Sequence, residues 1–373
     1  MRNSITYAAM DTHKKQHKVA LLYPGDDEII EFTIKNTASE IRKMVKKIKK
    51  QTSGKIKFCY EAGVCGFSLQ RRIESLGCDC SVIAPSLIPI KPGERIKTDR
   101  RDAKKLLSMF MAGLLTDVYP PDAQQEAARE LTRCRGTAKD NLKRIRHQIL
   151  KFLTRHGYIY ADGSHWTQKH VAWLRTLEFD QVLVREVFDS YFTEMQHCIQ
   201  RLDTLDKQLE ALAESEPYKE IVGLIRCFRG IDTLTAISVL TEIFNFGRFS
   251  SAQQFMSYLG LTPSESSSGD KQHKGPITKT GNKRVRWLLV EAGWNCRRGC
   301  NISAALKKRR EGQPQWAIDI ADRAGERLGK RYYRLISRGK IPCKVVVALA
   351  RELAGFIWSM LQEYEARIKK KAA

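Results

Sequence analysis

The first 110 residues alternate short strand patterns with amphipathic helix patterns, and this order constrains the fold more than any other feature. Apolar runs bounded by turn residues predict five strands, at residues 4–11, 17–23, 28–34, 56–61 and 80–84. Apolar positions three and four apart predict helices at residues 38–50 and 67–76, and a third helix from about residue 102. Short turns join the first three strands, so we expect an antiparallel meander within a mixed α/β domain.

Carboxylates stand at the ends of two predicted strands and at the head of the third helix. Asp11 ends the first strand, Glu61 ends the fourth, and Asp99 and Asp102 lie three residues apart. If the first and fourth strands are neighbours in one sheet, their acids lie close together, and residues three apart on a helix share a face. Mg²⁺ or Mn²⁺ prefers such oxygen ligands. The alternative is a capping Asp99 with a solvated Asp102.

The order of the four acids resembles the ribonuclease H-like layout. In such a site, two divalent cations can stabilise both the attacking and the leaving oxygen of a phosphoryl transfer. Basic residues surround the third and fourth acids, as Lys97, Arg100 and Arg101. A carboxylate pair in a basic setting indicates a cation that meets phosphate.

The net charge points to the same partner. The chain has 373 residues, with 65 Lys and Arg against 41 Asp and Glu, which gives a net charge of +24. A compact fold with that charge repels itself unless a polyanion screens it, so nucleic acid is the expected partner. An anionic membrane surface is the alternative, but we find no apolar run of transmembrane length.

Two long helical patterns follow the α/β region. Residues 122–155 combine an apolar face with many cations, among them Lys143 and Arg144, which predicts either phosphate contacts or an ordinary solvated face. From Val184 to Leu212 apolar residues alternate by four and three, which is the seam of a coiled coil. The partner of the seam is either a second copy of the chain or the helix before it.

The last third of the chain reads as helical and basic. Residues 224–236 indicate two helices joined by a tight turn, with Asp232 where a phosphate-binding hairpin usually has glycine. A loop rich in serine, glycine and lysine is then expected between two helices, either as a phosphate-binding segment or as a flexible surface loop. Its candidate nucleic-acid contacts, with those of the following helix, are Lys271, Lys274, Lys279, Arg284 and Arg286.

Several segments together resemble the DEDD transposases of bacterial insertion sequences, the one-ten group. These segments are Met10-Asp11-Thr12, Tyr60-Glu61-Ala62, residues 97–103, Gly260-Leu261-Thr262-Pro263 with Ser268-Gly269, and Lys279-Thr280-Gly281-Asn282 with Arg286. The resemblance extends from about residue 5 to about residue 360. The replacement of glycine by Asp232 departs from the usual hairpin pattern.

The resemblance implies an α/β RuvC-like (ribonuclease H fold) catalytic domain at residues 1–115, whose four acids are Asp11, Glu61, Asp99 and Asp102. A basic helical extension at 116–160, a coiled-coil linker at 161–217 and an all-α transposase domain at 218–373 are expected to follow. The last domain would supply a nucleophilic serine, matched by Ser268, with Ser266 and Ser267 as alternatives one or two residues away.

The same resemblance implies an RNA-guided, Mg²⁺-dependent recombinase that forms a covalent phosphoserine. Its partners would be donor DNA, target DNA and a structured non-coding guide RNA (bridge RNA). A dimer or tetramer would form through the coiled coil, in the bacterial cytoplasm close to the nucleoid. A RuvC-like endonuclease that resolves junctions with metal-activated water uses the same acids and is the first alternative. A non-enzymatic architectural or RNA-binding protein is the second.

Overall fold

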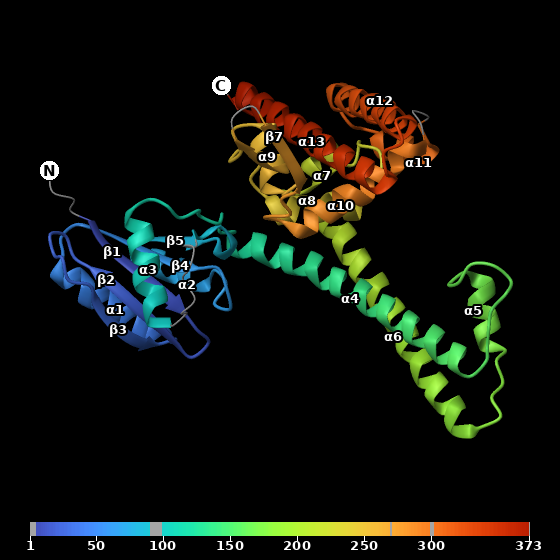
Figure 1. Cartoon of the computed structure of the whole chain (residues 1–373), viewed down its shortest axis with the longest axis horizontal. Coiled ribbons are helices and arrows are strands. Elements are labelled where there is room, and N and C mark those ends of the chain that lie inside the picture. The colour runs from blue at the N-terminus through green and yellow to red at the C-terminus, as the bar shows by residue number, and fades with distance from the viewer. Residues whose placement is uncertain (1–4, 90–98, 269–270, 299–301, 373) are drawn as a thin grey trace. The chain divides into compact units, whose positions relative to one another are not determined.

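The chain divides into two compact units, Met1–Asp122 and Ala123–Ala373, in a computed structural model that describes residues 5–89, 99–268, 271–298 and 302–372 (Figure 1). In its described part, residues 5–89 and 99–122, the first unit contains five strands, three α-helices and a short 3₁₀ turn at Pro85–Leu87. The second unit contains ten α-helices, a 3₁₀ turn at Trp294–Arg298 and a β-hairpin within the described residues.

The sheet of the first unit has the strand order β3-β2-β1-β4-β5. The strands are β1 (Ile5–Thr12), β2 (Gln16–Leu22), β3 (Ile30–Lys35), β4 (Lys55–Glu61) and β5 (Asp79–Ile83). The first three pair antiparallel, which confirms the predicted meander, and β1, β4 and β5 pair parallel. The first and fourth strands are therefore neighbours, as the placement of the acids required.

Helices cover both faces of this sheet. Helices α1 (Ala38–Gln51) and α2 (Ser68–Ser75) pack on one face, where Met10 and Tyr60 join the core with apolar residues of both helices. Helix α3 (Asp99–Met111) packs on the other face, where Ala9 and Cys59 contact its buried residues. Successive residues of a strand point to opposite faces of the sheet. Alternate residues of β1 and β4 therefore contact α3 on one face and α1 and α2 on the other.

The second unit is predominantly helical. Its helices are α4 (Ala123–Arg155), α5 (Gln168–Arg175), α6 (Val182–Ala213), α7 (Lys219–Ile225), α8 (Thr233–Ile243), α9 (Ala252–Tyr258), α10 (Lys283–Gly293), α11 (Ala304–Arg310), α12 (Gln315–Ser337) and α13 (Pro342–Ala372). The predicted pair of helices around residues 224–236 corresponds to α7 and α8. Asp232 caps α8 by accepting a hydrogen bond of 2.8 Å from the Thr235 amide. A capping aspartate therefore occupies the position of the expected glycine.

Helices α4 and α6 lie side by side as an antiparallel hairpin (Figure 1). Arg135 donates two hydrogen bonds to Asp206, of 2.7 and 3.2 Å, whereas further along α4 the Phe152 ring lies 6.4 Å from that of Phe188. The later residue of α4, Phe152, contacts the earlier residue of α6, Phe188, so the two helices run in opposite directions. The apolar seam of α6 thus packs on α4, the preceding long helix of the same chain, which is one of the two partners left open by the sequence.

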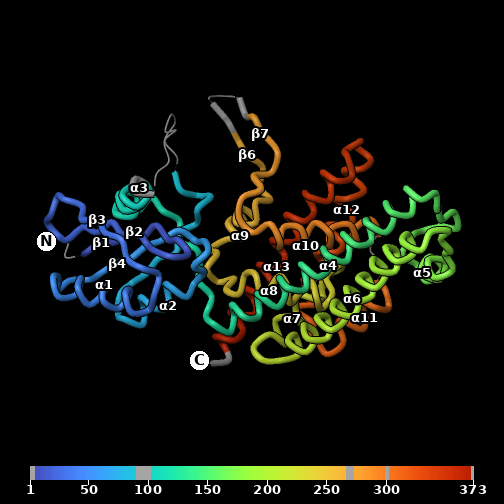
Figure 2. Tube along the Cα trace, turned by 90° about the horizontal axis from the view of Figure 1, so that it is seen from below, coloured from blue at the N-terminus to red at the C-terminus, as the bar shows by residue number. Residues whose placement is uncertain are grey.

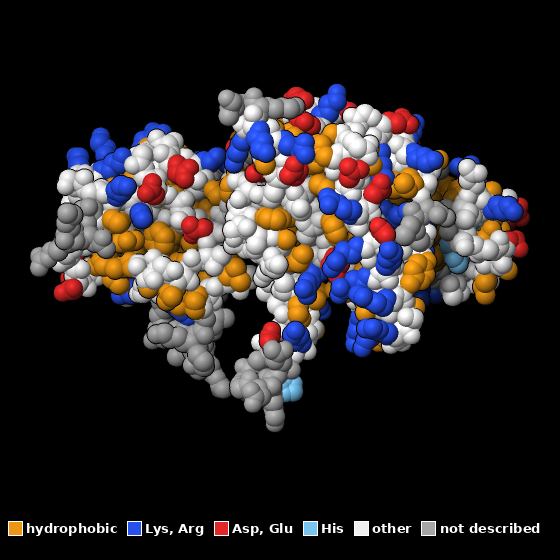
Figure 3. All heavy atoms as spheres, turned by 90° about the horizontal axis from the view of Figure 1, so that it is seen from above, with side chains coloured by type: hydrophobic (Ala, Val, Ile, Leu, Met, Phe, Trp, Pro, Cys, Tyr) orange, Lys and Arg blue, Asp and Glu red, His pale blue; other side chains and the backbone are white. Residues whose placement is uncertain are grey.

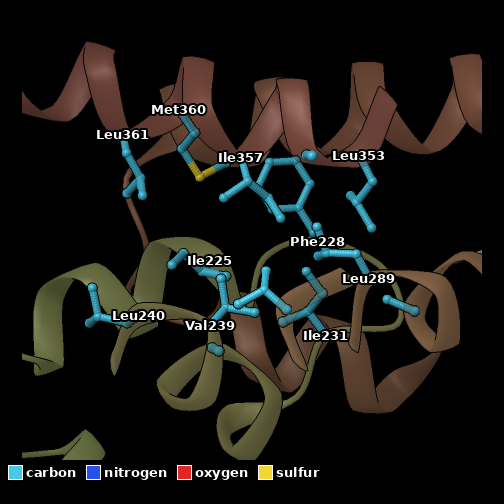
Figure 4. Packing of buried hydrophobic residues seen from close by; sticks show 14 of the residues in the cluster. Ile225, Phe228, Ile231, Val239, Leu240, Leu289, Leu353, Ile357, Met360 and Leu361 are labelled. Atoms are coloured by element: carbon cyan, nitrogen blue, oxygen red, sulfur yellow. The ribbon is translucent and has the colours of Figure 1, made fainter. Parts of the chain in front are cut away.

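Helix α13 lies in the main core of the second unit. Its residues Leu353, Ile357, Met360 and Leu361 point toward Phe228 and the apolar side chains of α7 and α8 (Figure 4). By length and composition alone this helix could cross a membrane, contrary to the sequence reading, but half of its most apolar window is buried inside the protein. Its apolar character is accounted for by core packing.

The serine-rich segment is a β-hairpin rather than the expected loop. Strands β6 (Pro263–Ser268) and β7 (Lys271–Ile277) pair antiparallel and project from the helices of their unit (Figure 2). The prediction of an all-α C-terminal domain was wrong at this segment. Serine, glycine and proline are poor strand formers, so the backbone pairing comes from the way the ends of the hairpin are held.

Candidate active site

The register of β1 and β4 places Asp11 beside Glu61. Met10 pairs with Tyr60, and each acid is the next residue of its strand. Asp11 lies two residues after Ala9, and Glu61 lies two residues after Cys59. The side chains of Ala9 and Cys59 both contact α3. Since strand residues two apart share a face, both carboxylates lie on the α3 side, at the carboxyl edge of the sheet.

Helix α3 runs opposite to β1. Near the end of the helix, the Phe110 ring lies 5.7 Å from the Tyr7 ring, early in β1. Six residues earlier in α3, the Lys104 Nζ lies 3.1 Å from a Glu31 carboxylate oxygen, and the sheet register places Glu31 level with Ala9, later in β1. The start of α3 is therefore directed toward the end of β1.

This direction brings Asp102, in the first turn of α3, toward the edge that carries Asp11 and Glu61. The Asp11 side chain is 22% exposed, and one of its oxygens lies 3.1 Å from His13 Nε2. The side chain of Asp99, with those of Arg100 and Arg101, and the whole of Lys97 lie outside the described residues.

The donor set of this edge is made of carboxylate oxygens, which fits a hard divalent cation such as Mg²⁺ or Mn²⁺. Asp11 and Glu61 are both partly exposed, so an ion has access to them. Among the side chains that the structure describes, no three His, Cys, Asp or Glu are gathered closely enough to hold one metal ion. The structure therefore places Asp11 and Glu61 on one face and edge and directs the start of α3, with Asp102, toward them, without closing a ligand shell.

A fifth carboxylate, which the sequence reading did not single out, lies on the same face of the sheet. Asp117 accepts a hydrogen bond of 3.2 Å from the Ser81 hydroxyl and pairs through its backbone with Ile83. Burial raises the pKa of the Cys59 thiol, and the negative charges of Asp117 and Glu61 add to that effect. A short bridge of this kind gives no periodic pattern, so the sequence held no signal for Asp117.

The predicted nucleophile lies at the tip of the β6–β7 hairpin. Ser268 is the last residue of β6 and pairs with Lys271, the first residue of β7. Ser267 and Ser266 pair with the next two residues of β7. The side chains of the three serines and of Lys271 lie outside the described residues, while Lys274 is exposed on β7.

Close backbone packing holds the base of the hairpin. Gly260 and Gly281 have φ angles of +63° and +67°, and a Cβ at Gly281 would overlap the carbonyl oxygen of Tyr258. Arg286 Nη1 donates hydrogen bonds to the carbonyl oxygens of Leu259 (2.7 Å) and Thr280 (2.9 Å), on the two sides of the hairpin. The two glycines and this arginine thus fix where the hairpin leaves the helices.

A buried carboxylate links that base to α4. The Glu242 side chain is 2% exposed and accepts hydrogen bonds from Arg133 of 2.9 and 3.0 Å and from Asn282 of 2.9 Å. Asn282 also caps α10 by accepting from the Val285 amide. Burial alone would raise the pKa of Glu242, but the bonds from Arg133 and Asn282 outweigh it and the pKa is lowered.

The remaining candidate cations fall into two groups. Lys143, Arg144 and Lys279 are exposed, whereas Arg284 donates to the Thr132 carbonyl oxygen and is half-buried beside Glu242. Arg286 is likewise engaged at the hairpin base. The exposed cations are accessible from solvent, whereas the two half-buried arginines have hydrogen-bond partners within the protein.

A basic pocket of about 430 Å³ lies between α4, α8 and α10. Lys139 Nζ lies 5.2 Å from the ring centroid of Trp287, which is 48% exposed. Lys and Arg side chains are also dense on the projecting end of α12 (Figure 3), where Lys330 and Arg334 line a second pocket. Exposed cations beside an open aromatic ring suit a nucleic-acid strand, because phosphate and base are both accommodated.

Comparisons with known proteins match both units. A family model described as "Transposase" matches residues 8–157, and one described as "Transposase IS116/IS110/IS902 family" matches residues 223–308. The chain is 37% identical to the putative transposase y4qE of Sinorhizobium fredii, over 96% of this chain and 88% of that protein. It belongs to the IS116/IS110/IS902 family of transposases. This IS110-type chain is also 34% identical to the transposase for insertion sequence element IS1533 of Leptospira borgpetersenii, over 90% of this chain and 97% of that protein.

The family places the candidate residues within a DNA transposase. Asp11, Glu61, Asp99 and Asp102 fall inside the first matched region, and Ser268 and the hairpin base fall inside the second. Neither family model covers residues 158–222, which contain α5 and α6 of this transposase. As a transposase, the chain acts on DNA, in agreement with its net charge of +24.

Proposed function

We propose that this transposase cleaves and exchanges DNA strands through a covalent phosphoserine, with its acids binding Mg²⁺ or Mn²⁺. The observation that supports the proposal best is the common face and edge of Asp11 and Glu61, toward which the start of α3, with Asp102, is directed. Carboxylates so placed, with Asp99 three residues before Asp102, would hold cations that polarise the scissile phosphate.

The proposed nucleophile is Ser268. A serine hydroxyl is a weak nucleophile at neutral pH and needs an exact position relative to its substrate. The hairpin supports this role because its base is fixed by Gly260, Gly281 and Arg286 while its serines lie next to its tip. In the proposed step, Oγ loses its proton and bonds to phosphorus, and the departing deoxyribose oxygen takes up a proton.

We propose further that a structured guide RNA pairs with donor and target DNA. We also propose that the protein forms a dimer or tetramer in the bacterial cytoplasm and that its active site is assembled between protomers. The charge of +24 supports two polyanionic partners. Candidate contacts on exposed cations are Lys143, Arg144, Lys274 and Lys279. Sequencing of RNA that co-purifies with the protein tests the guide, because a degradation mixture without one dominant species contradicts it.

The covalent step is tested with labelled DNA of the element's ends on denaturing gels. We expect wild type to give a protein-linked strand, Ser268→Ala to give none, and Ser267→Ala and Ser266→Ala to behave as wild type. An adduct that persists in Ser268→Ala and disappears in Ser267→Ala or Ser266→Ala assigns the nucleophile to that neighbour. Free cut ends without any adduct would instead indicate hydrolysis by water, as in a RuvC-like endonuclease.

The role of the acids is tested in the same assay with Asp11→Asn. We expect adduct formation to fall by at least about 100-fold, the scale on which positioned catalytic groups act. Asp26→Asn is a suitable control, since Asp26 lies in the exposed turn between β2 and β3. Unchanged adduct formation in Asp11→Asn contradicts a metal-dependent mechanism at this edge.

A further inference from the structure

A pocket of about 420 Å³ lies at the far end of the α4–α6 hairpin, where α5 packs beside both helices (Figure 1). Its lining includes Lys151 of α4, Tyr160 of the following segment, and His170 and Trp173 of α5. Six of its eleven lining residues lie in the region that neither family model covers, and the other five belong to α4 within the first matched region. Its volume is within the range of pockets that bind small organic groups.

His170 presents an unpaired donor at this pocket. The residue is fully buried, and its Nδ1 accepts a hydrogen bond of 3.1 Å from the Trp166 amide. Burial, with the nearby His165, lowers the pKa of His170, which favours the neutral ring. A neutral ring whose Nδ1 accepts must carry its proton on Nε2. That Nε2 has no hydrogen-bond partner within the described protein.

Aromatic rings form the walls around this donor. The Tyr160 ring centroid lies 4.8 Å from that of His170 and 5.2 Å from that of Trp173. Tyr160 and Trp173 are each only half-buried, so part of each ring stays accessible. An entering group that is flat and apolar on its faces can pack against these rings while it offers an acceptor at its edge.

The backbone next to the lining residue His165 is strained. Trp166 has a φ of +67°, a conformation that a bulky residue rarely adopts. The Arg146 guanidinium lies 5.2 Å from the Trp166 ring centroid, and the amide of this strained residue is the one that fixes the His170 tautomer. Strain of this kind persists where the surroundings over-determine it and is concentrated at functional sites.

We propose that this pocket binds one unpaired nucleobase of a nucleic-acid strand, with an acceptor on the base edge receiving the His170 Nε2–H. The base stacks on the accessible part of Tyr160 or Trp173, and Lys151 meets the phosphate of the same nucleotide. A nucleobase satisfies all three requirements: flat apolar faces, acceptor atoms at its edge and an attached negative charge. Both DNA and RNA carry this chemistry.

Photochemical cross-linking of the full chain tests the proposal. Two single strands are used, one of DNA and one of RNA, each with 5-iodouracil in place of its pyrimidine bases. Irradiation followed by peptide mapping is expected to place a cross-link on Tyr160 or Trp173, and the strand that gives it identifies the source of the base. Absence of any cross-link within residues 147–173 from both strands overturns the proposal.

Matched variants separate binding from packing. Tyr160→Phe keeps the ring and is expected to bind the cross-linking strand as wild type does. Tyr160→Leu removes the ring face and is expected to weaken binding about 5- to 150-fold, the usual range for loss of one base–aromatic stack. Equal affinity of both variants contradicts stacking at this site.

His170→Asn tests the donor, because the Asn oxygen can still accept from the Trp166 amide while the Nε2–H is removed. We expect a weaker cross-link in this variant, with a thermal midpoint close to that of wild type. Lys169→Gln, an exposed change on the same helix, serves as a charge control and should leave the cross-link intact. A cross-link in His170→Asn as strong as in this control contradicts the role of His170.

Discussion

At the scale of single residues, the sequence predicted those acids whose neighbours follow from strand order, and missed those whose partners are remote. Asp11 and Glu61 could be paired because each ends a recognisable strand, and parallel neighbours end at one edge. The partner of Glu242, Arg133, is 109 residues away, so no local pattern connects them. The one available signal was a carboxylate within the otherwise apolar run of α8.

The Glu242 network predicts a stability that depends on pH. The pKa of Glu242 is lowered in the folded protein, so its contribution is present above the ordinary glutamate pKa of about 4.3 and is lost as the pH falls through the lower, folded value. Glu242→Gln should lower the free energy of unfolding by about 2–3 kcal/mol at pH 7, less than for a fully buried pair because Arg133 is 47% exposed.

Urea unfolding at pH 7 and at acid pH measures this effect. We expect the difference between wild type and Glu242→Gln to shrink as the solution is acidified, because the wild-type carboxylate is then protonated as well. Glu186→Gln, an exposed change on α6, should unfold as wild type does at both pH values. A constant difference across the pH range would show that the charge of Glu242 is not what stabilises the second unit.

At the scale of elements, the order of helices and strands was predictable wherever apolar periodicity is strong. The five strands and the first two helices of the first unit lie within about two residues of their expected ends, since alternation and 3.6-residue spacing are both clear there, whereas α3 begins three residues earlier than expected. The β6–β7 hairpin was not predictable, because serine, glycine and proline give no alternation. Its existence depends on the tertiary anchors Gly260, Gly281 and Arg286.

The α4–α6 hairpin predicts opposite outcomes for two adjacent residues. Phe188 is 2% exposed where it packs on α4, whereas Val187 is 43% exposed. Phe188→Ala should lower the free energy of unfolding by about 3–5 kcal/mol, the usual cost of removing a buried aromatic ring. Val187→Ala should cost less than about 0.5 kcal/mol.

Thermal unfolding at several protein concentrations measures both variants and tests the partner of the seam. Because the seam packs on α4 of the same chain, the destabilisation in Phe188→Ala should be independent of concentration. A destabilisation that grows on dilution would mean that a second copy of the chain contributes to the seam. A larger destabilisation in Val187→Ala than in Phe188→Ala would mean that the face of α6 that carries Val187 packs on α4, contrary to the structure.

At the scale of the whole molecule, charge and family agree on the substrate. The two units carry separate cores, and the family models match a region in each. Net charge is a property of composition and was available from the sequence at once. The sequence did not tell which cations remain exposed. Only the packing shows that Arg284 and Arg286 donate to carbonyl oxygens, while Lys143 and Arg144 remain exposed.

The excess of cations predicts a steep dependence of DNA affinity on salt. Release of counterions from about 6–10 phosphate contacts should weaken binding about 10³- to 10⁵-fold between about 50 and 200 mM salt. Replacing Lys143 and Arg144 by glutamine should reduce the logarithmic slope by about one for each phosphate that is no longer neutralised. Fluorescence anisotropy over this range measures the slope, and a flat response would contradict binding through exposed cations.

The central place of β1 in its sheet has a consequence for the decay of insertion elements. Residues 5–12 supply both the strand between β2 and β4 and the first acid, Asp11. A copy of the gene that loses its first codons therefore loses the fold of the first unit and the chemistry together. Ala123–Ala373 keeps a core of its own, so we expect such a remnant to keep the fold of the second unit while it lacks the sheet that carries Asp11 and Glu61.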